Sequence, residues 1–193
     1  MKKNKELILF MPFIGGGGVE KNLFIISNFL ITKIKNITVC TVSRDFKKKF
    51  NKKIKFLTPT KKISKKINIR MNYLICLFVL FKYLRKNKNC TVLSFQANIY
   101  CIILCKLFNI KIIVRSNSSP SGWYHNNIKK LLYKNIILLA DRVIVNSLEF
   151  KKQMINRFGI KVHCIYNPLN TSKILDDSKK GKIDNFFRTK KMY

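Results

Sequence analysis

Short apolar runs alternate with segments of helical periodicity along most of the chain. Residues 7–13 (LILFMPF) form a continuous apolar run of strand length, a pattern typical of a strand buried on both faces. Beyond the glycines that follow, Val19, Leu23, Ile26 and Leu30 recur at helical spacing. The same criteria predict further strands at 37–43, 54–59, 91–95, 111–116, 140–147 and 161–168, and further helices at 70–86, 97–108, 128–139 and 150–158, the last closed by Gly159.

The repeated alternation of strand and helix indicates the fold class. Strands this apolar are buried on both faces, and parallel strands need crossover connections of the length seen here. The sequence therefore predicts an α/β domain over residues 1–170, with a Rossmann-like, doubly wound parallel sheet. Residues 171–193 are polar and lack sustained periodicity, which predicts a linker after the domain.

The most apolar stretch, MNYLICLFVLFKYL (71–84), has 14 residues before Arg85. That is short for a membrane-spanning helix, so a buried helix is the favoured interpretation, and a helix that dips into a membrane stays open. The basic N-terminus runs into a glycine loop after a short apolar segment. No secretory signal peptide is therefore predicted.

In doubly wound folds, ligands bind outside the carboxyl ends of the strands. Gly15, Gly16, Gly17 and Gly18 follow the first predicted strand and are four of the chain's 7 glycines. Such a loop permits a tight turn, and the N-terminus of the next helix suits a phosphate. Valine and glutamate follow the last glycine, which excludes a P-loop, and the spacing does not fit a dinucleotide fingerprint. Spacing alone leaves a permissive turn and a phosphate site open.

Polar side chains at other predicted strand ends are the next candidates. Arg115 has the geometry to clamp a phosphate or a sugar hydroxyl, and Asn117 offers both donors and an acceptor. His125 is a weaker candidate, because a single loop histidine is usually solvated, and His163 in the last predicted strand is interpreted as structural. The same rule selects Ser43, Arg44, Phe95, Gln96, Asn146, Ser147, Glu149, Asn167 and Pro168.

The charge is strongly basic. The chain has 40 Lys and Arg against 8 Asp and Glu, a net charge of +32, which favours an anionic partner. Lysine supplies 33 of the 40 basic residues, whereas specific nucleic-acid readers rely on arginine, so no specific nucleic-acid function is predicted. Residues 44–70 hold ten Lys and two Arg. A solvated surface is the safer interpretation; docking on anionic lipid, helped by Phe46, Phe50 and Phe56, is the functional alternative.

Cysteine and acidic residues give no sign of a metal centre. The six cysteines contain no Cys-x-x-Cys pair and mostly lie in apolar runs, so buried free thiols in a reducing cytosol are predicted. Acidic residues are few, scattered and without an Asp-x-Asp motif. No metal ion or other cofactor is therefore predicted.

Several motifs occur in one order between Leu7 and Asn170: GGGGVEKNLFIISNFL, VLSFQANIYCIILCKLF, KIIVRSNSSP, ADRVIVNSLEFKKQMINRFG and VHCIYNPLN. Together they resemble the N-terminal domain of family-4 glycosyltransferases, retaining GT-B enzymes that build bacterial lipopolysaccharide, capsule and glycolipids. The resemblance implies one half of a GT-B fold, which holds the acceptor beside a nucleotide sugar, the donor substrate.

The resemblance also assigns residues to the cleft between the two halves. It implies that the glycine loop borders the donor diphosphate, that residues 166–170 lead to the second domain, and that these side chains line the cleft: Glu20, Arg115, Asn117, Asn146, Ser147 and Glu149. The nucleotide-binding half of the family has no counterpart in the sequence. The resemblance thus implies a truncated or split enzyme, with residues 171–193 as a linker or the start of a donor domain supplied in trans.

Two functions follow from these observations. The first is hexosyl transfer from a nucleotide sugar to a lipid-linked or polysaccharide acceptor in cell-surface glycan biosynthesis. Its expected location is the cytoplasm, peripheral on the inner face of the cell membrane. The alternative is a noncatalytic basic module that binds a membrane surface or a glycan.

Overall fold

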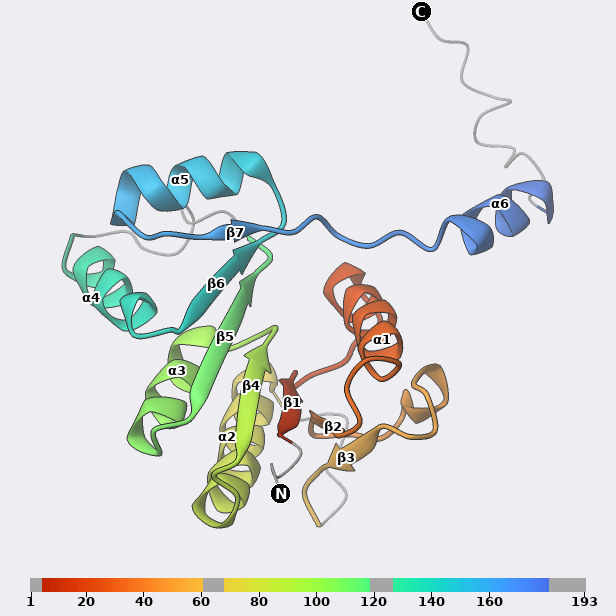
Figure 1. Cartoon of the computed structure of the whole chain (residues 1–193), viewed down its shortest axis with the longest axis horizontal. Coiled ribbons are helices and arrows are strands. Elements are labelled where there is room, and N and C mark those ends of the chain that lie inside the picture. The colour runs from red at the N-terminus through yellow and green to blue at the C-terminus, as the bar shows by residue number, and fades with distance from the viewer. Residues whose placement is uncertain (1–4, 61–67, 119–126, 181–193) are drawn as a thin grey trace, which may run out of the picture.

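The computed structural model describes residues 5–60, 68–118 and 127–180. Within them, seven strands form one parallel sheet in the order β3-β2-β1-β4-β5-β6-β7 (Figure 1). The strands are β1 (Glu6–Phe10), β2 (Ile37–Cys40), β3 (Lys55–Leu57), β4 (Cys90–Ser94), β5 (Lys111–Ser116), β6 (Arg142–Val145) and β7 (His163–Cys164). The helices are α1 (Gly18–Leu30), α2 (Ile69–Lys86), α3 (Asn98–Leu107), α4 (Asn127–Leu138), α5 (Leu148–Phe158) and α6 (Thr171–Lys180), with a short 3-10 helix at Lys47–Lys49.

The strand order reverses between β1 and β4, which pair in parallel from Glu6 opposite Cys90 to Phe10 opposite Ser94. Chain segments leave these two strands in opposite directions along the sheet, so a crevice opens outside their carboxyl ends. The predicted Rossmann-like, doubly wound α/β fold is confirmed. The reversal also fixes where a ligand is expected.

Helices cover both faces of the sheet and enclose two hydrophobic clusters. On one face, Ile8 and Phe10 of β1 pack in the same cluster as Leu80 of α2 and Phe158 of α5. On the other face, β1 and β2 pack against α1, and Phe24 meets the Phe50 ring edge-on at 4.9 Å. The alternation of inward side chains along each strand accounts for the two clusters.

Five of the six cysteines, Cys40, Cys76, Cys90, Cys101 and Cys105, are buried, and all six are free thiols. This confirms that the cysteines are free thiols and mostly buried, as their place in apolar runs predicts. The Sγ atoms of Cys40 and Cys76 lie 3.5 Å apart in the core. Burial, followed by a hydrogen bond with Cys40, raises the pKa of Cys76, and burial first of all raises the pKa of Cys90 to about 11. Such thiols stay protonated and behave as small apolar side chains.

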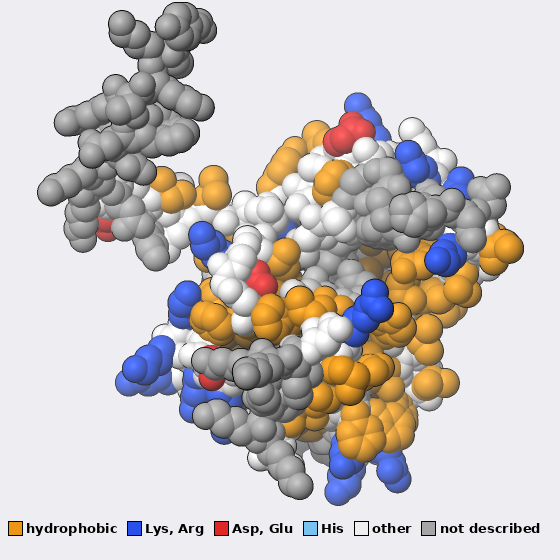
Figure 2. All heavy atoms as spheres, turned by 180° about the vertical axis from the view of Figure 1, so that it is seen from behind, with side chains coloured by type: hydrophobic (Ala, Val, Ile, Leu, Met, Phe, Trp, Pro, Cys, Tyr) orange, Lys and Arg blue, Asp and Glu red, His pale blue; other side chains and the backbone are white. Residues whose placement is uncertain are grey.

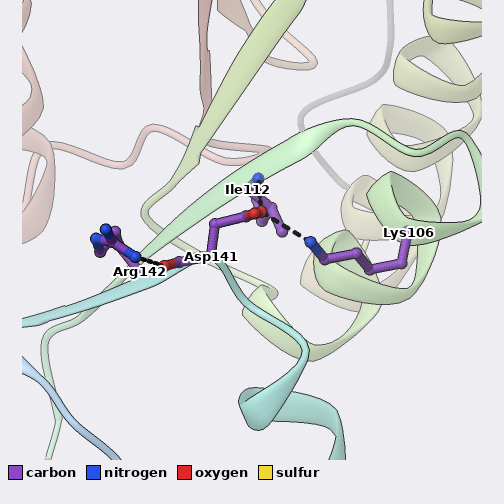
Figure 3. Close-up of polar contacts among 4 residues, drawn as sticks. All are labelled: Lys106, Ile112, Asp141 and Arg142. Carbon is purple, nitrogen blue, oxygen red and sulfur yellow. Dashed lines mark hydrogen bonds and ion pairs between the residues drawn. The ribbon is translucent and has the colours of Figure 1, made fainter.

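The amino-terminal edge of the sheet is closed by two polar networks. The Glu6 carboxylate accepts hydrogen bonds from the hydroxyl groups of Thr38 and Tyr83. At the start of β6, the Asp141 carboxylate accepts from Lys106 Nζ and from the Ile112 N–H, both at 2.8 Å (Figure 3). Burial acts to raise the pKa of Asp141, but its hydrogen bonds, together with the charge of Lys106, outweigh burial and lower that pKa.

Several strands end earlier than the sequence predicts. Strand β1 stops at Phe10 rather than residue 13, β2 at Cys40 rather than 43, and β7 has two residues instead of eight. At the sheet edge, β7 pairs only with β6, and beyond Ile165 the chain is held by the Arg115 side chain instead of by a continued strand ladder. Residues 11–13 (MPF) after β1 continue its apolar run, which made the predicted strand longer than the paired segment.

Helix α6 lies where the sequence predicts a linker without regular structure. Its Ile174 and Leu175 side chains are exposed, so no buried stripe marks the segment in the sequence. An extended segment after β7 leads to α6, which stands apart from the sheet (Figure 1). Residues 181–193, also assigned to the linker, lie outside the described residues.

Candidate functional site

The glycine loop lies where the sequence places it, between β1 and α1 at the reversal of strand order. Gly16 has a φ of +92°, a conformation that favours glycine, and Gly17 is the N-cap of α1. All four glycines are exposed. The first N–H groups of a helix have no partner within the helix, and the positive end of the helix dipole lies there. The loop is therefore an electropositive backbone surface at the crevice.

The side chain of Glu20 folds back over this loop. Its Oε1 accepts a hydrogen bond from the Gly15 N–H at 3.3 Å, and its Oε2 lies 2.8 Å from where a Cβ on Gly17 would stand. Glu20 is buried. The pKa of Tyr73 on α2 is raised first by the burial of Tyr73 and second by the negative charge of Glu20. A carboxylate thus already occupies part of the loop, so a second anion there would meet repulsion unless Glu20 moved away.

The turn between β4 and α3 forms the opposite wall of the crevice. Ala97, the N-cap of α3, has a left-handed backbone with φ 54° and ψ 35°, which is strained for an alanine. Flanking side chains hold it: Ser94 Oγ donates to the Gln96 carbonyl, and Asn98 Nδ2 donates to the Arg115 carbonyl at 3.1 Å. Strained backbone held by its neighbours is concentrated at functional sites in proteins.

Arg115 is buried at the end of β5. Its Nη2 donates at 3.0 Å to the Ile165 carbonyl and to Asn167 Oδ1, so it fastens β5 to the segment after β7. Within the described part of the chain, its Nε has no hydrogen-bond partner. Burial lowers the pKa of Arg115 below its ordinary value. The guanidinium is thus held to the fold through Nη2, whereas its buried Nε–H has no partner among the described residues.

Two asparagines at neighbouring strand ends also have unpaired atoms. Asn117 Nδ2 donates to the Phe95 carbonyl at 3.4 Å. The Oδ1 atoms of Asn117 and Asn146 are buried, and no described residue donates to either. A buried acceptor without a partner is unfavourable, and in native proteins it needs an explanation such as a bound ligand or water.

Ser147 and Glu149 lie at the start of α5. Ser147 is the N-cap and its Oγ accepts from the Phe150 N–H at 3.1 Å, while exposed Glu149 accepts from Gln153 Nε2 at 3.0 Å. Both positions stabilise the first turn of a helix. His163 begins β7, away from the carboxyl ends of the strands, and His125 lies outside the described residues.

A pocket of about 400 Å³ opens beside these residues, within the usual size range for small-molecule sites. Val114, Val143 and Met154 give it an apolar floor. Among the residues that the structure describes, its polar lining includes no carboxylate and consists of Gln96, Asn98, Tyr100, Arg115, Ser116, Asn117, Ser118 and Tyr133. Asn98, Tyr100 and Tyr133 were not selected from the sequence, because they lie inside helical apolar patterns instead of at strand ends.

Only some of the site residues predicted from the sequence line the pocket. Arg115 and Asn117 line it together with Val19 of α1, whereas Ser147 and Glu149 do not. A second pocket, of about 320 Å³, lies at the opposite edge of the sheet beside Asp141 and His163. Among residues 5–60, 68–118 and 127–180, no group of three or more His, Cys, Asp or Glu could hold a metal ion.

The sequence itself decides the family. The model of glycosyltransferase family 4 matches residues 16–173. The chain belongs to glycosyltransferase family 4. No curated protein matches the sequence.

Solved structures with the same fold are glycosyltransferases. Anabaena Alr3699/HepE in complex with UDP and glucose aligns with a TM-score of 0.61 and 14% identity, over 87% of this chain and 46% of that one. A UGT transferase from Siraitia grosvenorii in complex with UDP gives 0.57 and 13%, over 91% and 55%. Phytolacca americana UGT2, complexed with UDP-2fluoro-glucose and pterostilbene, gives 0.58 and 9%, over 94% and 58%.

At these identities the similarity shows the fold. The family-4 chain spans about half the length of these glycosyltransferase structures. It therefore corresponds to one Rossmann-like half of the GT-B architecture, as the sequence motifs imply.

Proposed function

We propose that this chain is the acceptor-binding half of a glycosyltransferase. It transfers a hexose from a nucleotide sugar to a lipid-linked or polysaccharide acceptor in cell-surface glycan biosynthesis, at the cytoplasmic face of the membrane. The observation that carries the proposal is the pocket at the carboxyl edge of the sheet, where Arg115 Nε and Asn117 Oδ1 are buried and unpaired within the described structure. Structures of similar fold are complexes with UDP and glucose, which supports a nucleotide sugar as the donor.

The polar groups of the pocket suit a hydroxyl-bearing acceptor. A sugar hydroxyl both donates and accepts, so one hydroxyl could donate to Asn117 Oδ1 while another accepts from Arg115 Nε. The described lining of the pocket includes no carboxylate and its floor is apolar, which fits the hydroxyl-lined edge and apolar face of a sugar ring. Satisfying two buried, unpaired atoms would make binding selective for such a ligand.

The donor side of the reaction needs a second Rossmann-like half, on the same polypeptide or on another chain. A leaving diphosphate must be stabilised by cations or backbone dipoles. The N-terminus of α1 supplies a dipole at the crevice, and we assign the cations to the second half, with no metal ion required. Glu20 would have to turn away from the loop as the diphosphate approaches, because two anions repel each other.

The test is sugar transfer measured with the chain alone and with the polypeptide encoded downstream of it. Radiolabelled UDP-glucose is the first donor, and bacterial membranes supply lipid-linked acceptors. We expect labelled lipid or glycan only when a donor half is present, and about a tenfold lower rate for Asn117→Ala. Asn156→Ala, which changes an exposed asparagine of α5 outside the pocket, is the matched control and should keep the rate. Absence of both transfer and glycan binding in every mixture would contradict the proposal.

A noncatalytic glycan-binding module is the second candidate. The observation that favours it is the Glu20 carboxylate, which occupies the glycine loop that a diphosphate would border. It predicts glycan binding that depends on Asn117, with no turnover of nucleotide sugars in any mixture. Calorimetric titration with glycans, run beside the transfer assay, separates the two candidates.

A further inference from the structure

Helices α2 and α3 present large apolar side chains on their outer surface. Each helix has a row at positions i, i+3 and i+7, which lies along one helix face. The exposed fractions of these side chains run from 41% to 74%. We call these residues the apolar face: Met71, Leu74 and Phe78 on α2, and Tyr100, Ile103 and Leu107 on α3. Helix α2, predicted as a buried helix, is therefore buried along one side only.

Aromatic rings join the two helices near their C-terminal ends. Phe81 of α2 packs against Phe108 at a centroid distance of 5.4 Å and stacks on Phe78. Three cations lie over these rings: Lys82 over Phe78, Arg85 over Phe81 and Lys88 over Phe108, at 4.4, 5.8 and 3.9 Å. We call Lys82, Arg85 and Lys88 the basic rim. Figure 2 shows the same side of the molecule, with hydrophobic side chains gathered above a group of Lys and Arg.

An apolar face with a basic rim fits the surface of a membrane that contains acidic lipids. Apolar side chains enter the boundary between headgroups and acyl chains, while cations next to them pair with anionic headgroups. None of the described helices is long and apolar enough to cross a membrane. The contact would therefore lie along the bilayer surface.

Charge argues against the other occupants of this face. A second copy carries the same net charge of +32 and would bring two basic rims together, which is repulsive. A donor half would pack at the carboxyl edge of the sheet, whereas the basic rim lies at the C-terminal ends of crossover helices, toward the opposite edge. Single-stranded nucleic acid favours stacked aromatic platforms, but four of the six residues of the apolar face are aliphatic.

We propose that the apolar face and the basic rim dock the protein on an anionic membrane surface. Tyr100 belongs to the apolar face and also lines the pocket, so docking would bring the pocket mouth to the bilayer. If the chain binds an acceptor as proposed above, that acceptor would be lipid-linked, with its sugar in the pocket. The docking itself does not depend on glycosyl transfer.

Co-sedimentation of the full chain with vesicles tests the proposal. The vesicles contain phosphatidylcholine alone, or phosphatidylcholine with about one third phosphatidylglycerol, so that only the second kind is anionic. We expect binding to the anionic vesicles, weakened by salt. Leu74→Glu combined with Ile103→Glu should lower the partition coefficient at least about tenfold, because each places a charge in the apolar face. The control, Phe29→Glu with Ile155→Glu, changes exposed residues of α1 and α5 by the same charge.

A second pair of variants tests the basic rim. Lys82→Gln, Arg85→Gln and Lys88→Gln together should lower the partition coefficient by roughly a hundredfold, since each cation at the surface contributes about fivefold. The control removes the same charge from Lys48, Lys52 and Lys53, which are exposed lysines in the basic segment 44–70. Its fold-decrease in the partition coefficient should be less than about a tenth of that for the basic rim. Residues 61–67 of that segment lie outside the described residues.

Several outcomes would overturn the docking proposal. Equal losses for both lysine sets would show that only the overall charge attracts the vesicles. Unchanged binding of the Leu74 and Ile103 double variant would exclude the apolar face. A dimer in sedimentation velocity that this variant dissociates, without vesicle binding by the unmodified chain, would assign the face to a second copy. Asn117→Ala should leave vesicle binding unchanged, so failure of the pocket and failure of the face are distinguishable.

Discussion

The amino-terminal and carboxyl ends of the strands in the parallel sheet differ in how completely their partly or fully buried polar groups are hydrogen-bonded. At the amino-terminal edge, Glu6 accepts two hydrogen bonds from side chains, and Asp141 accepts from a lysine and a backbone N–H. At the carboxyl edge, Arg115, Asn117 and Asn146 each leave a buried atom without a partner among the described residues. The named polar groups at the amino-terminal edge find their hydrogen-bond partners within the protein. Those at the carboxyl edge need a ligand or water to supply the missing partners.

This difference in hydrogen bonding separates residues that stabilise the fold from residues whose polar atoms are available to a ligand. A fully satisfied buried network rigidifies a fold, whereas an unpaired buried group costs free energy and is retained where a ligand or water can satisfy it. The pocket lies at the incomplete edge, and so does the glycine loop. Arg115 belongs to both classes, because it is fastened through Nη2 and open at Nε.

Arg115 gives the largest expected effect on stability. Arg115→Ala removes the hydrogen bonds to the Ile165 carbonyl and to Asn167, and we expect the free energy of unfolding to fall by about 3 kcal/mol. Urea denaturation followed by circular dichroism measures the change. Arg142→Ala, on the next strand but exposed, should cost less than about 0.5 kcal/mol. An equally small loss of unfolding free energy for Arg115→Ala would show that Arg115 does not stabilise the fold and is kept for a ligand.

Asp141 tests the complete edge, and its effect depends on pH. Asp141→Ala should lower the free energy of unfolding by about 1–2 kcal/mol near neutral pH, because the Lys106 and Ile112 bonds are lost. The folded-state pKa of Asp141 lies below its ordinary value of 3.8, so its stabilisation is present above that value and is lost as pH falls through the folded-state pKa. The difference between variant and unmodified chain should therefore shrink below about pH 4. A pH-independent difference would contradict this account.

The sequence predicts the fold well because the fold depends on patterns that a single chain displays. Apolar runs marked the central strands such as β1 and β5, and Gly159 has the left-handed conformation expected of a C-cap, with φ 65°. Glycine, proline and apolar periodicity act locally, so they can be read without knowing tertiary contacts. Strand ends were less predictable, because pairing partners set them, as at β7.

The site was predictable only in part. The strand-end rule selected Arg115 and Asn117, which line the pocket. It could not show that Glu20 turns back onto Gly15, or that Ala97 is left-handed, because both depend on side-chain packing in three dimensions. One further signal was present for Asn98, which is a polar position beside Gln96 between two strongly apolar runs.

The glycine loop gives opposite effects at two neighbouring positions. Gly16→Ala should lower the free energy of unfolding by about 1–2 kcal/mol, because φ is +92° there. Gly18→Ala should raise it by up to about 1 kcal/mol, since Gly18 is helical and its surroundings are open. Thermal denaturation of both variants gives the two signs. A lower free energy of unfolding for Gly18→Ala would contradict the open surroundings of Gly18.

Asn117 should give the smallest effect on stability and the clearest separation of the two classes. Asn117→Ala removes an unpaired buried acceptor along with one long hydrogen bond of 3.4 Å, so the free energy of unfolding should change by less than about 0.5 kcal/mol. The matched control is Asn28, whose amide makes two bonds, accepting from the Asn51 N–H at 2.7 Å and donating to the Lys49 carbonyl at 2.9 Å. Asn28→Ala should cost about 1 kcal/mol. Equal costs would show that Asn117 serves the fold, whereas a stable Asn117 variant that no longer binds glycans would show that its oxygen is kept for a ligand.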